Sequence, residues 1–225
     1  MQLADGWTGL RSAVKSLLPR TLVVRRLAGT VAPSVLLTFD DGPHPEVTPA
    51  VLDRMDAYGA RAVFFVVGNR VKRAAHLLHE IRRRGHLLGN HSYLHHANYM
   101  LTGTPQPRFG LYYRDLQRCQ EVVEHHTGDK PRLFRPPGGR LTPVTLLVPK
   151  LLGLRCVTWS VDVGDWRFRS EAEAGAGGQE LLRLITPGDI VLLHDDNPSV
   201  LDLLDILLPG LQGRRYDLGS GINAL

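Results

Sequence analysis

The chain has 225 residues, of which 43% are hydrophobic and 22% charged, an ordinary composition for a globular protein. Its net charge of +5 comes mainly from residues 1–30, which carry five Lys and Arg residues against Asp5 alone, so the remainder offers no broad nucleic-acid surface. The two cysteines, Cys119 and Cys156, are too few and too far apart for a disulfide framework or a thiolate metal site.

The first 30 residues are predicted to form a basic extension. Apolar residues recur at helical spacing until Pro19 ends the pattern: Trp7, Leu10, Val14, Leu17 and Leu18. We expect this amphipathic helix to pack on the domain or on a partner, and the alternative is peripheral contact of residues 7–18 with an anionic membrane. No apolar run reaches the roughly 20 residues of a membrane span, and the opening residues lack the charged-then-apolar order of a signal peptide.

Residues 31–225 have the length of a single domain, in which predicted strands alternate with predicted helices. The strands are expected at 35–39, 62–67, 86–91, 133–135, 156–161 and 190–193. The helices are expected at 48–58, 71–84, 112–126, 142–152, 181–185 and 200–208. Residues 171–178, which are rich in Gly, Ala and Glu, are predicted to be a mobile loop. This alternation predicts a mainly parallel α/β barrel or doubly wound sheet.

Two adjacent carboxylates, Asp40 and Asp41, follow the strand predicted at 35–39, and Gly42-Pro43 then turns the chain. In α/β folds, ligands and chemistry collect at the carboxyl ends of parallel strands. Because neighbouring carboxylates repel each other, a fold keeps them together with a cation or a proton. An ordinary turn is the alternative interpretation, and the later strand ends decide against it.

His91 ends the third of these strands, and His95 follows four residues later, so one turn of helix would place both histidines on the same face. Two imidazoles and one carboxylate make a ligand set for catalytic zinc or non-haem iron. Asp41 is the natural third ligand, and Asp40 would then remain free to accept a proton. His96 would take the place of His95 if the turn had a different register.

Three more strand ends carry chemistry. Arg135 precedes two prolines, and its guanidinium could pair with Asp40 and orient it as a base, although a surface arginine is the alternative. Asp165 lies next to Trp166, a pair suited to sugar binding or to orienting a histidine. His194 ends the last strand and would be a good general acid if a carboxylate such as Asp165 raised its pKa.

Taken together, these residues resemble the NodB-type polysaccharide deacetylases of carbohydrate esterase family four, which include chitin, chitooligosaccharide and peptidoglycan deacetylases. Five motifs stand in the family's order between about residues 35 and 195: Thr38–Pro43, His91–His95, Arg135–Gly139, Asp162–Trp166 and Leu192–Asp195. The resemblance implies a distorted, incomplete (β/α) barrel. It also implies a hydrolase that removes acetyl groups from N-acetylated amino sugars of a glycan, by cleaving a carbon–nitrogen bond that is not a peptide bond.

The resemblance also implies individual roles. A divalent metal, usually zinc, would be held by Asp41, His91 and His95. Asp40 would act as base and His194 as acid, with Arg135 tethering Asp40 and Asp165 orienting His194. The substrate would meet Pro137, Gly138, Trp166 and Leu192.

One position departs from the family pattern. At residue 138 the family has an aromatic residue, typically Tyr, whose backbone N–H stabilises the oxyanion. Gly138 keeps this N–H and loses the side-chain wall of the groove. Two alternatives therefore stay open: an inactive carbohydrate-binding relative, and a deacetylase or deformylase of a lipid-linked amino sugar, which the basic N-terminal helix would suit.

Overall fold

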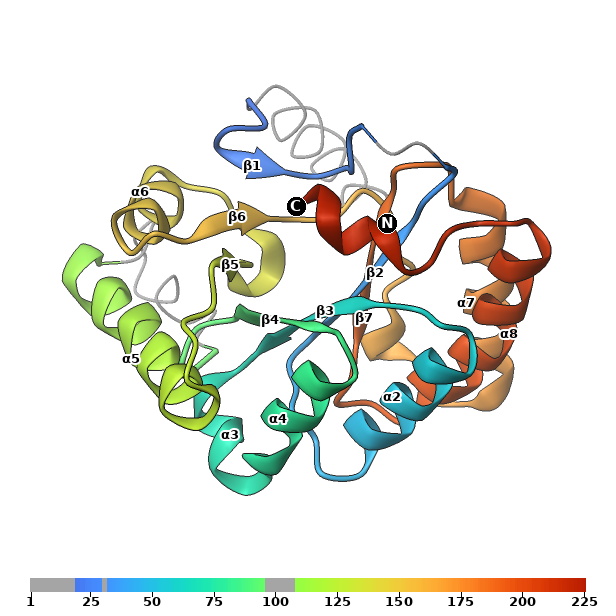
Figure 1. Ribbon diagram of the computed structural model, residues 1–225, viewed down its shortest axis with the longest axis horizontal. Helices are drawn as coiled ribbons and strands as arrows, with labels where there is room; N and C mark the ends of the chain where they lie inside the picture. The colour runs from blue at the N-terminus through green and yellow to red at the C-terminus, as the bar shows by residue number, and fades with distance from the viewer. Residues whose placement is uncertain (1–18, 30–31, 96–107) are drawn as a thin grey trace, which may run out of the picture.

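The structure is a computed structural model that describes residues 19–29, 32–95 and 108–225 (Figure 1). Its frame is a seven-stranded sheet in the order β1-β6-β5-β4-β3-β2-β7, and every neighbouring pair is parallel. The strands are β1 (Val23–Val24), β2 (Leu36–Asp40), β3 (Ala62–Val66), β4 (Leu87–Asn90), β5 (Leu133–Phe134), β6 (Arg155–Val157) and β7 (Ile190–His194). Because the curled sheet does not close between β1 and β7, it forms an open half-barrel, and the predicted incomplete (β/α) barrel is confirmed.

The helices surround the sheet on its outer side (Figure 1). They are α2 (Val47–Ala57), α3 (Gly68–Ala74), α4 (His76–Arg83), α5 (Phe109–Thr127), α6 (Pro143–Leu151), α7 (Glu171–Leu184) and α8 (Ser199–Gly213). Three short 3₁₀ turns are η2 (Pro137–Gly139), η3 (Asp165–Arg167) and η4 (Ser220–Ala224). The helix predicted over 71–84 is divided into α3 and α4.

Side chains along β2 alternate between two cores. Leu37 and Phe39 pack in the core shared with the helices, whereas Leu36 belongs to a separate core inside the half-barrel. Successive residues of a strand point to opposite faces, so Thr38 and Asp40 lie on the same side as Leu36. Each fully buried Leu or Phe contributes about 1.5–3 kcal/mol of burial free energy, and this alternation fixes which residues of β2 face inward. The strand therefore delivers Asp40 to the inside of the half-barrel.

The prediction of a mobile loop over residues 171–178 is wrong, because these residues form the first half of α7. Ser170 caps the helix by accepting a hydrogen bond from the backbone N–H of Glu173. Gly177 and Gly178 lie where α7 meets its neighbours: a Cβ at Gly177 would lie 2.5 Å from the Phe168 ring, and one at Gly178 would lie 3.0 Å from Ile206 on α8. Tertiary packing outweighs the poor helix propensity of glycine here.

The predicted N-terminal extension lies largely outside the described residues, since the description begins at residue 19. Of its last part, Val23 and Val24 form β1, which pairs with β6 at one edge of the sheet. The helical pattern at residues 7–18 and its suggested membrane contact fall on residues that the structure does not describe. In the described part of the chain, no helix is both long enough and apolar enough to span a bilayer.

Candidate active site

The carboxyl ends of β2, β4 and β7 lead into a pocket of about 540 Å³. Its walls combine acidic and imidazole side chains with tryptophans and a Gly-Gly turn. The lining residues are Asp40, Asp41, His91, His95, Gly138, Gly139, Trp159, Trp166, Arg169, Leu192, His194, Asp196, Asn197 and Pro198. Most of the residues predicted from the sequence therefore meet in one cavity, at the end of the sheet where chemistry was expected.

Asp40 and Asp41 reach the same pocket through an unusual backbone turn. Neighbouring residues of an extended strand point to opposite faces, so a straight continuation of β2 would send the two carboxylates apart. Asp41 instead adopts a left-handed conformation with φ 74°, which non-glycine residues visit rarely and Asp tolerates better than most. Both side chains consequently line the pocket. No local sequence pattern predicts the left-handed conformation of Asp41.

His91 and His95 are brought together by a non-helical turn, so the predicted helical face is wrong. Ser92 has φ 66° and His95 has φ 51°, and the two imidazole ring centroids lie 5.0 Å apart. The buried Asp115 of α5 holds this turn by accepting two of its backbone N–H groups at 3.1 and 3.2 Å. The alternative ligand, His96, lies outside the described residues.

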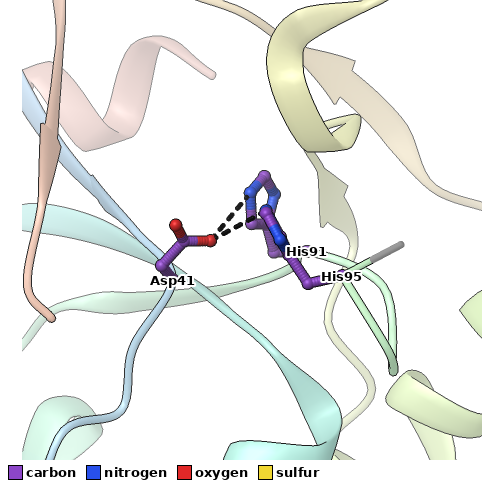
Figure 2. Close-up of side chains that lie close together, drawn as sticks. All are labelled: Asp41, His91 and His95. Atoms are coloured by element: carbon purple, nitrogen blue, oxygen red, sulfur yellow. Dashed lines mark ion pairs between the residues drawn. The ribbon is translucent and has the colours of Figure 1, made fainter. Parts of the chain in front are cut away.

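Asp41, His91 and His95 converge on one point (Figure 2). Oδ1 of Asp41 lies 2.9 Å from His95 Nε2 and 3.5 Å from His91 Nε2, and the three potential ligand atoms are within 4.8 Å of one another. That oxygen is buried, yet it accepts no well-formed hydrogen bond from the described residues. A buried carboxylate oxygen facing two imidazole nitrogens suits a divalent cation, and two nitrogens with one oxygen are a ligand set typical of catalytic metal sites.

The protonation states agree with metal binding. Nδ1 of His91 lies 2.8 Å from the Arg135 carbonyl, so this nitrogen donates the hydrogen and leaves the Nε2 lone pair facing Asp41. Burial lowers the pKa of His91, which favours the neutral ring. Burial alone would raise the pKa of Asp41, but His95 and His91 together hold it well below its usual range. The site therefore presents an ionised carboxylate and a neutral imidazole at neutral pH.

Arg135 is fully buried inside the half-barrel and pairs with Asp40. Its Nη1 donates to Asp40 Oδ1 at 2.8 Å and to Thr38 Oγ1 at 2.7 Å. Its other nitrogens donate to the carbonyls of Val157 and Thr158, and its guanidinium lies 4.2 Å above the centroid of the Phe65 ring. The predicted pairing with Asp40 is present in the structure, and the surface alternative is not.

This buried pair makes a stability prediction. Arg135→Met is expected to lower the free energy of unfolding by about 3–5 kcal/mol, because it leaves Asp40 buried without its partner. Chemical denaturation monitored by circular dichroism measures the loss. Arg155→Met, at an exposed position of β6, serves as the control and should change stability little. Equal stability of the two variants would contradict the assigned pairing.

His194 forms a second buried pair, with Asp165. One carboxylate oxygen of Asp165 lies 2.9 Å from His194 Nδ1, and the other accepts the His194 backbone N–H at 2.8 Å. Burial lowers the pKa of His194, but the hydrogen bond to Asp165 and the charge of that carboxylate outweigh it and raise the pKa to about 9. The Trp166 ring packs edge-on against the imidazole at 5.0 Å. His194 is therefore a protonated imidazole on the pocket wall at neutral pH.

Comparison with known proteins agrees with this arrangement. The polysaccharide deacetylase family matches residues 28–157, which is more than half of the chain. The chain belongs to the polysaccharide deacetylase family. The resemblance inferred from the five motifs is thereby confirmed.

Two deacetylases and one crystal structure illustrate how far the family likeness extends. The chain is 34% identical over 183 residues to the peptidoglycan-N-acetylglucosamine deacetylase PgdA of Listeria monocytogenes; this match covers 81% of the chain and only 37% of PgdA. It is 35% identical to the chitooligosaccharide deacetylase of Azorhizobium caulinodans, over 82% of the chain and 91% of that enzyme. The crystal structure of the Bc1960 peptidoglycan N-acetylglucosamine deacetylase superposes with a TM-score of 0.78 at 26% identity, covering 92% of each chain.

Of the four substrate-binding residues that the deacetylase motifs implied, Gly138, Trp166 and Leu192 line the pocket, whereas Pro137 begins the 3₁₀ turn η2 and does not. Gly138 has φ 63°, and a Cβ placed there would meet nothing within 4 Å. The pocket is open at this point of its wall. Next to it, Gly139 makes room for the Trp159 ring, 2.3 Å from where a Cβ would stand.

Several residues that line the pocket were not predicted from the sequence. They are Gly139, Trp159, Arg169, Asp196, Asn197 and Pro198. Gly139 belongs to the Arg135–Gly139 motif and Trp159 shortly precedes the Asp162–Trp166 motif, so their positions near the strand ends were a usable signal. Arg169 and the 196–198 segment come from loops whose path depends on the tertiary fold, and no local pattern marks them.

Proposed function

We propose that this chain is a metal-dependent hydrolase that removes acetyl groups from N-acetylated amino sugars of a glycan such as peptidoglycan or a chitooligosaccharide. One observation carries the proposal. The candidate metal triad shares its pocket with a carboxylate that pairs with a buried arginine and with a protonated imidazole that pairs with a buried carboxylate. The curated relatives are described as deacetylases of these two glycan classes. The geometry supports the same reaction here.

Asp41 and Asp40 have different roles in this proposal, as a metal ligand and as the base. A divalent ion held by Asp41, His91 and His95, which we infer to be zinc, would supply Lewis acidity that polarises the acetamide carbonyl and activates water. Asp40 accepts the proton of the attacking water through Oδ2, since Oδ1 is held by Arg135. The left-handed conformation of Asp41 brings both carboxylates into the pocket, where Asp41 serves as a ligand and Asp40 remains free to act as the base.

His194 ends β7, the strand next to the one that ends in the proposed base Asp40. Asp40 and His194 are register partners on adjacent parallel strands, so their side chains flank the same end of the pocket. His194 donates its Nε2 proton to the leaving amine, and Asp165 keeps the proton-bearing Nδ1 in place. The backbone N–H of Gly138 donates to the developing oxyanion. The net reaction adds water across the amide and yields acetate and a free amino sugar.

The His194–Asp165 pair predicts a specific pH dependence. The acid works only while protonated, and its raised pKa keeps it protonated up to about pH 9. Asp165→Asn removes the charge that opposes the effect of burial, so the pKa should fall toward or below about 6.5, the ordinary value for His. The alkaline limb of the kcat/KM profile should therefore move to lower pH. Because a bound cation would lower the pKa in both proteins, the difference between them is the quantity measured.

A neighbouring acid provides the control for this experiment. Asp162 is exposed and accepts a 2.7 Å hydrogen bond from the Trp159 indole, whereas His194 is hydrogen-bonded to Asp165. Asp162→Asn should leave the alkaline limb where it is in the wild type. An Asp165→Asn profile that coincides with that of Asp162→Asn would remove Asp165 as the residue that sets the pKa of the acid.

The substrate is tested with an acetate-release assay on the metal-loaded protein. Its arms are N-acetylglucosamine oligomers, peptidoglycan fragments and a lipid-linked N-acetylated amino sugar. Acetate from either soluble glycan supports the proposal, whereas release confined to the lipid-linked sugar supports the alternative raised by the basic residues 7–18. A protein that holds metal and binds the oligomers without releasing acetate would instead be an inactive carbohydrate-binding relative.

A further inference from the structure

Three consecutive backbone carbonyls, those of residues 40 to 42, each accept a hydrogen bond that stabilises the turn at Asp41. The Asp40 carbonyl accepts the backbone N–H of Asp195 at 3.2 Å, and the Gly42 carbonyl accepts that of Val67 at 2.8 Å. The carbonyl between them, that of Asp41, accepts a hydrogen bond from Nη1 of Arg70. Of these three donors only the last belongs to a side chain, so it alone depends on residue identity.

Arg70 is itself held in place by a carboxylate. It projects from α3, and the same Nη1 pairs with Asp196 Oδ2 at 2.7 Å, while Asp196 follows β7 two residues after His194. The pair is partly shielded, with 38% of the Arg70 side chain and 25% of that of Asp196 exposed. Arg70 thus joins the segments after β2 and β7 through Asp41 and Asp196, which both line the pocket.

The hydrogen bond from Arg70 can stabilise the left-handed backbone conformation of Asp41. A left-handed non-glycine residue costs about 1–3 kcal/mol and persists only where its surroundings enforce it. Relaxation of Asp41 to an extended conformation would turn its carboxylate away from the two histidines, because adjacent side chains of a strand point to opposite faces. A donor on the Asp41 carbonyl opposes that relaxation without occupying the carboxylate, which stays available for a metal.

We propose that Arg70 is a positioning residue for the metal site, oriented by Asp196. Arg70 is not among the residues that line the pocket, so it acts through Asp41 and not through the substrate. This inference rests on the proposed metal-dependent function. Outer contacts of this kind typically change metal affinity by about 10–100-fold when removed.

The test is a calorimetric titration of the metal-free protein with Zn²⁺. Arg70→Met should raise the Zn²⁺ dissociation constant about tenfold. Arg70→Lys, which keeps a cationic donor near both oxygens, should recover part of the affinity. Arg83→Met is the matched control, since Arg83 pairs with Glu80 on the exposed face of α4 and lies away from the pocket. At saturating Zn²⁺, KM for the glycan should be unchanged in Arg70→Met.

The inference is overturned if Arg70→Met and Arg83→Met bind Zn²⁺ equally well. Should Arg70→Met lack a cooperative unfolding transition, Arg70→Lys and Asp196→Asn decide instead. Weaker Zn²⁺ binding by both, with an unchanged Tm of the metal-free protein, supports the positioning role, and wild-type affinity in both refutes it. Failure of the proposed function is seen separately, as a wild-type protein that binds Zn²⁺ but releases no acetate.

Discussion

Asp40→Asn is expected to bind metal normally and to lose turnover by about 10²–10⁴-fold, the usual contribution of a general base. The substitution keeps the size of the side chain and an oxygen that can accept from Arg135, whose Nη1 lies 2.8 Å from Asp40 Oδ1. It removes only the ability to take a proton from water. Acetate release measured at saturating metal and glycan gives the change in kcat, and calorimetry gives the metal affinity.

The control for this prediction is an acid of the same type far from the pocket. Asp205 of α8 pairs with Arg54 on the surface, and 54% of its side chain is exposed. Asp205→Asn should retain wild-type turnover. Normal turnover in Asp40→Asn would show that another group accepts the proton, whereas loss of metal would show that Asp40 is a ligand and not a free base.

His91→Ala is expected to abolish stable metal binding and, with it, acetate release. His91 is buried, and its Nε2 faces both Asp41 Oδ1 at 3.5 Å and Asp40 Oδ2 at 3.6 Å. Removing one of three protein ligands leaves two, too few for a stable catalytic site of the usual three-ligand kind. Elemental analysis after dialysis should find about one ion per wild-type chain and almost none in the variant.

Loss of a buried ring can also disturb folding, so the matched control is another buried histidine. His86 precedes β4, is 3% exposed, and accepts the backbone N–H of Ala62 at 3.1 Å, outside the active-site pocket. His86→Ala should lose stability and still hold the metal. Unchanged metal content in His91→Ala would contradict the ligand assignment.

The sequence predicted best what depends on the order of strands and their ends. The apolar strands are readable because parallel strands are buried on both faces, and each one that carries chemistry ends in a polar residue. Asp40, Asp41, His91 and His194 could therefore be assigned to one edge of the sheet. Because buried charges need partners, Asp40 and His194 could be paired with Arg135 and Asp165 from the sequence.

What the sequence could not predict is the backbone geometry that aims these side chains. The spacing of His91 and His95 suggested a helix, but two left-handed residues form the turn instead. Their energetic support comes from Asp115 of α5, which is distant in sequence. The same holds for Arg70 and Asp196, whose contact with Asp41 depends on how α3 and β7 are placed around β2. Such long-range contacts leave no periodic trace in the chain.

The glycine content of residues 171–178 predicts a mobile loop, which is wrong because the structure has a helix there. Gly177 and Gly178 allow close packing of α7 against Phe168 and α8. Local propensity is a weak guide where two elements approach this closely. Gly138 differs from both, since nothing in the described structure fills the space beside it.

We propose that the Asp41, His91 and His95 site makes this chain a metal-dependent deacetylase. It is tested most directly by measuring acetate released from an N-acetylglucosamine oligomer before chelation, after chelation, and after Zn²⁺ is restored. We expect acetate and free amine in equal amounts, loss of both on chelation, and recovery with about one Zn²⁺ per chain. Acetate release that persists in metal-free protein would contradict it.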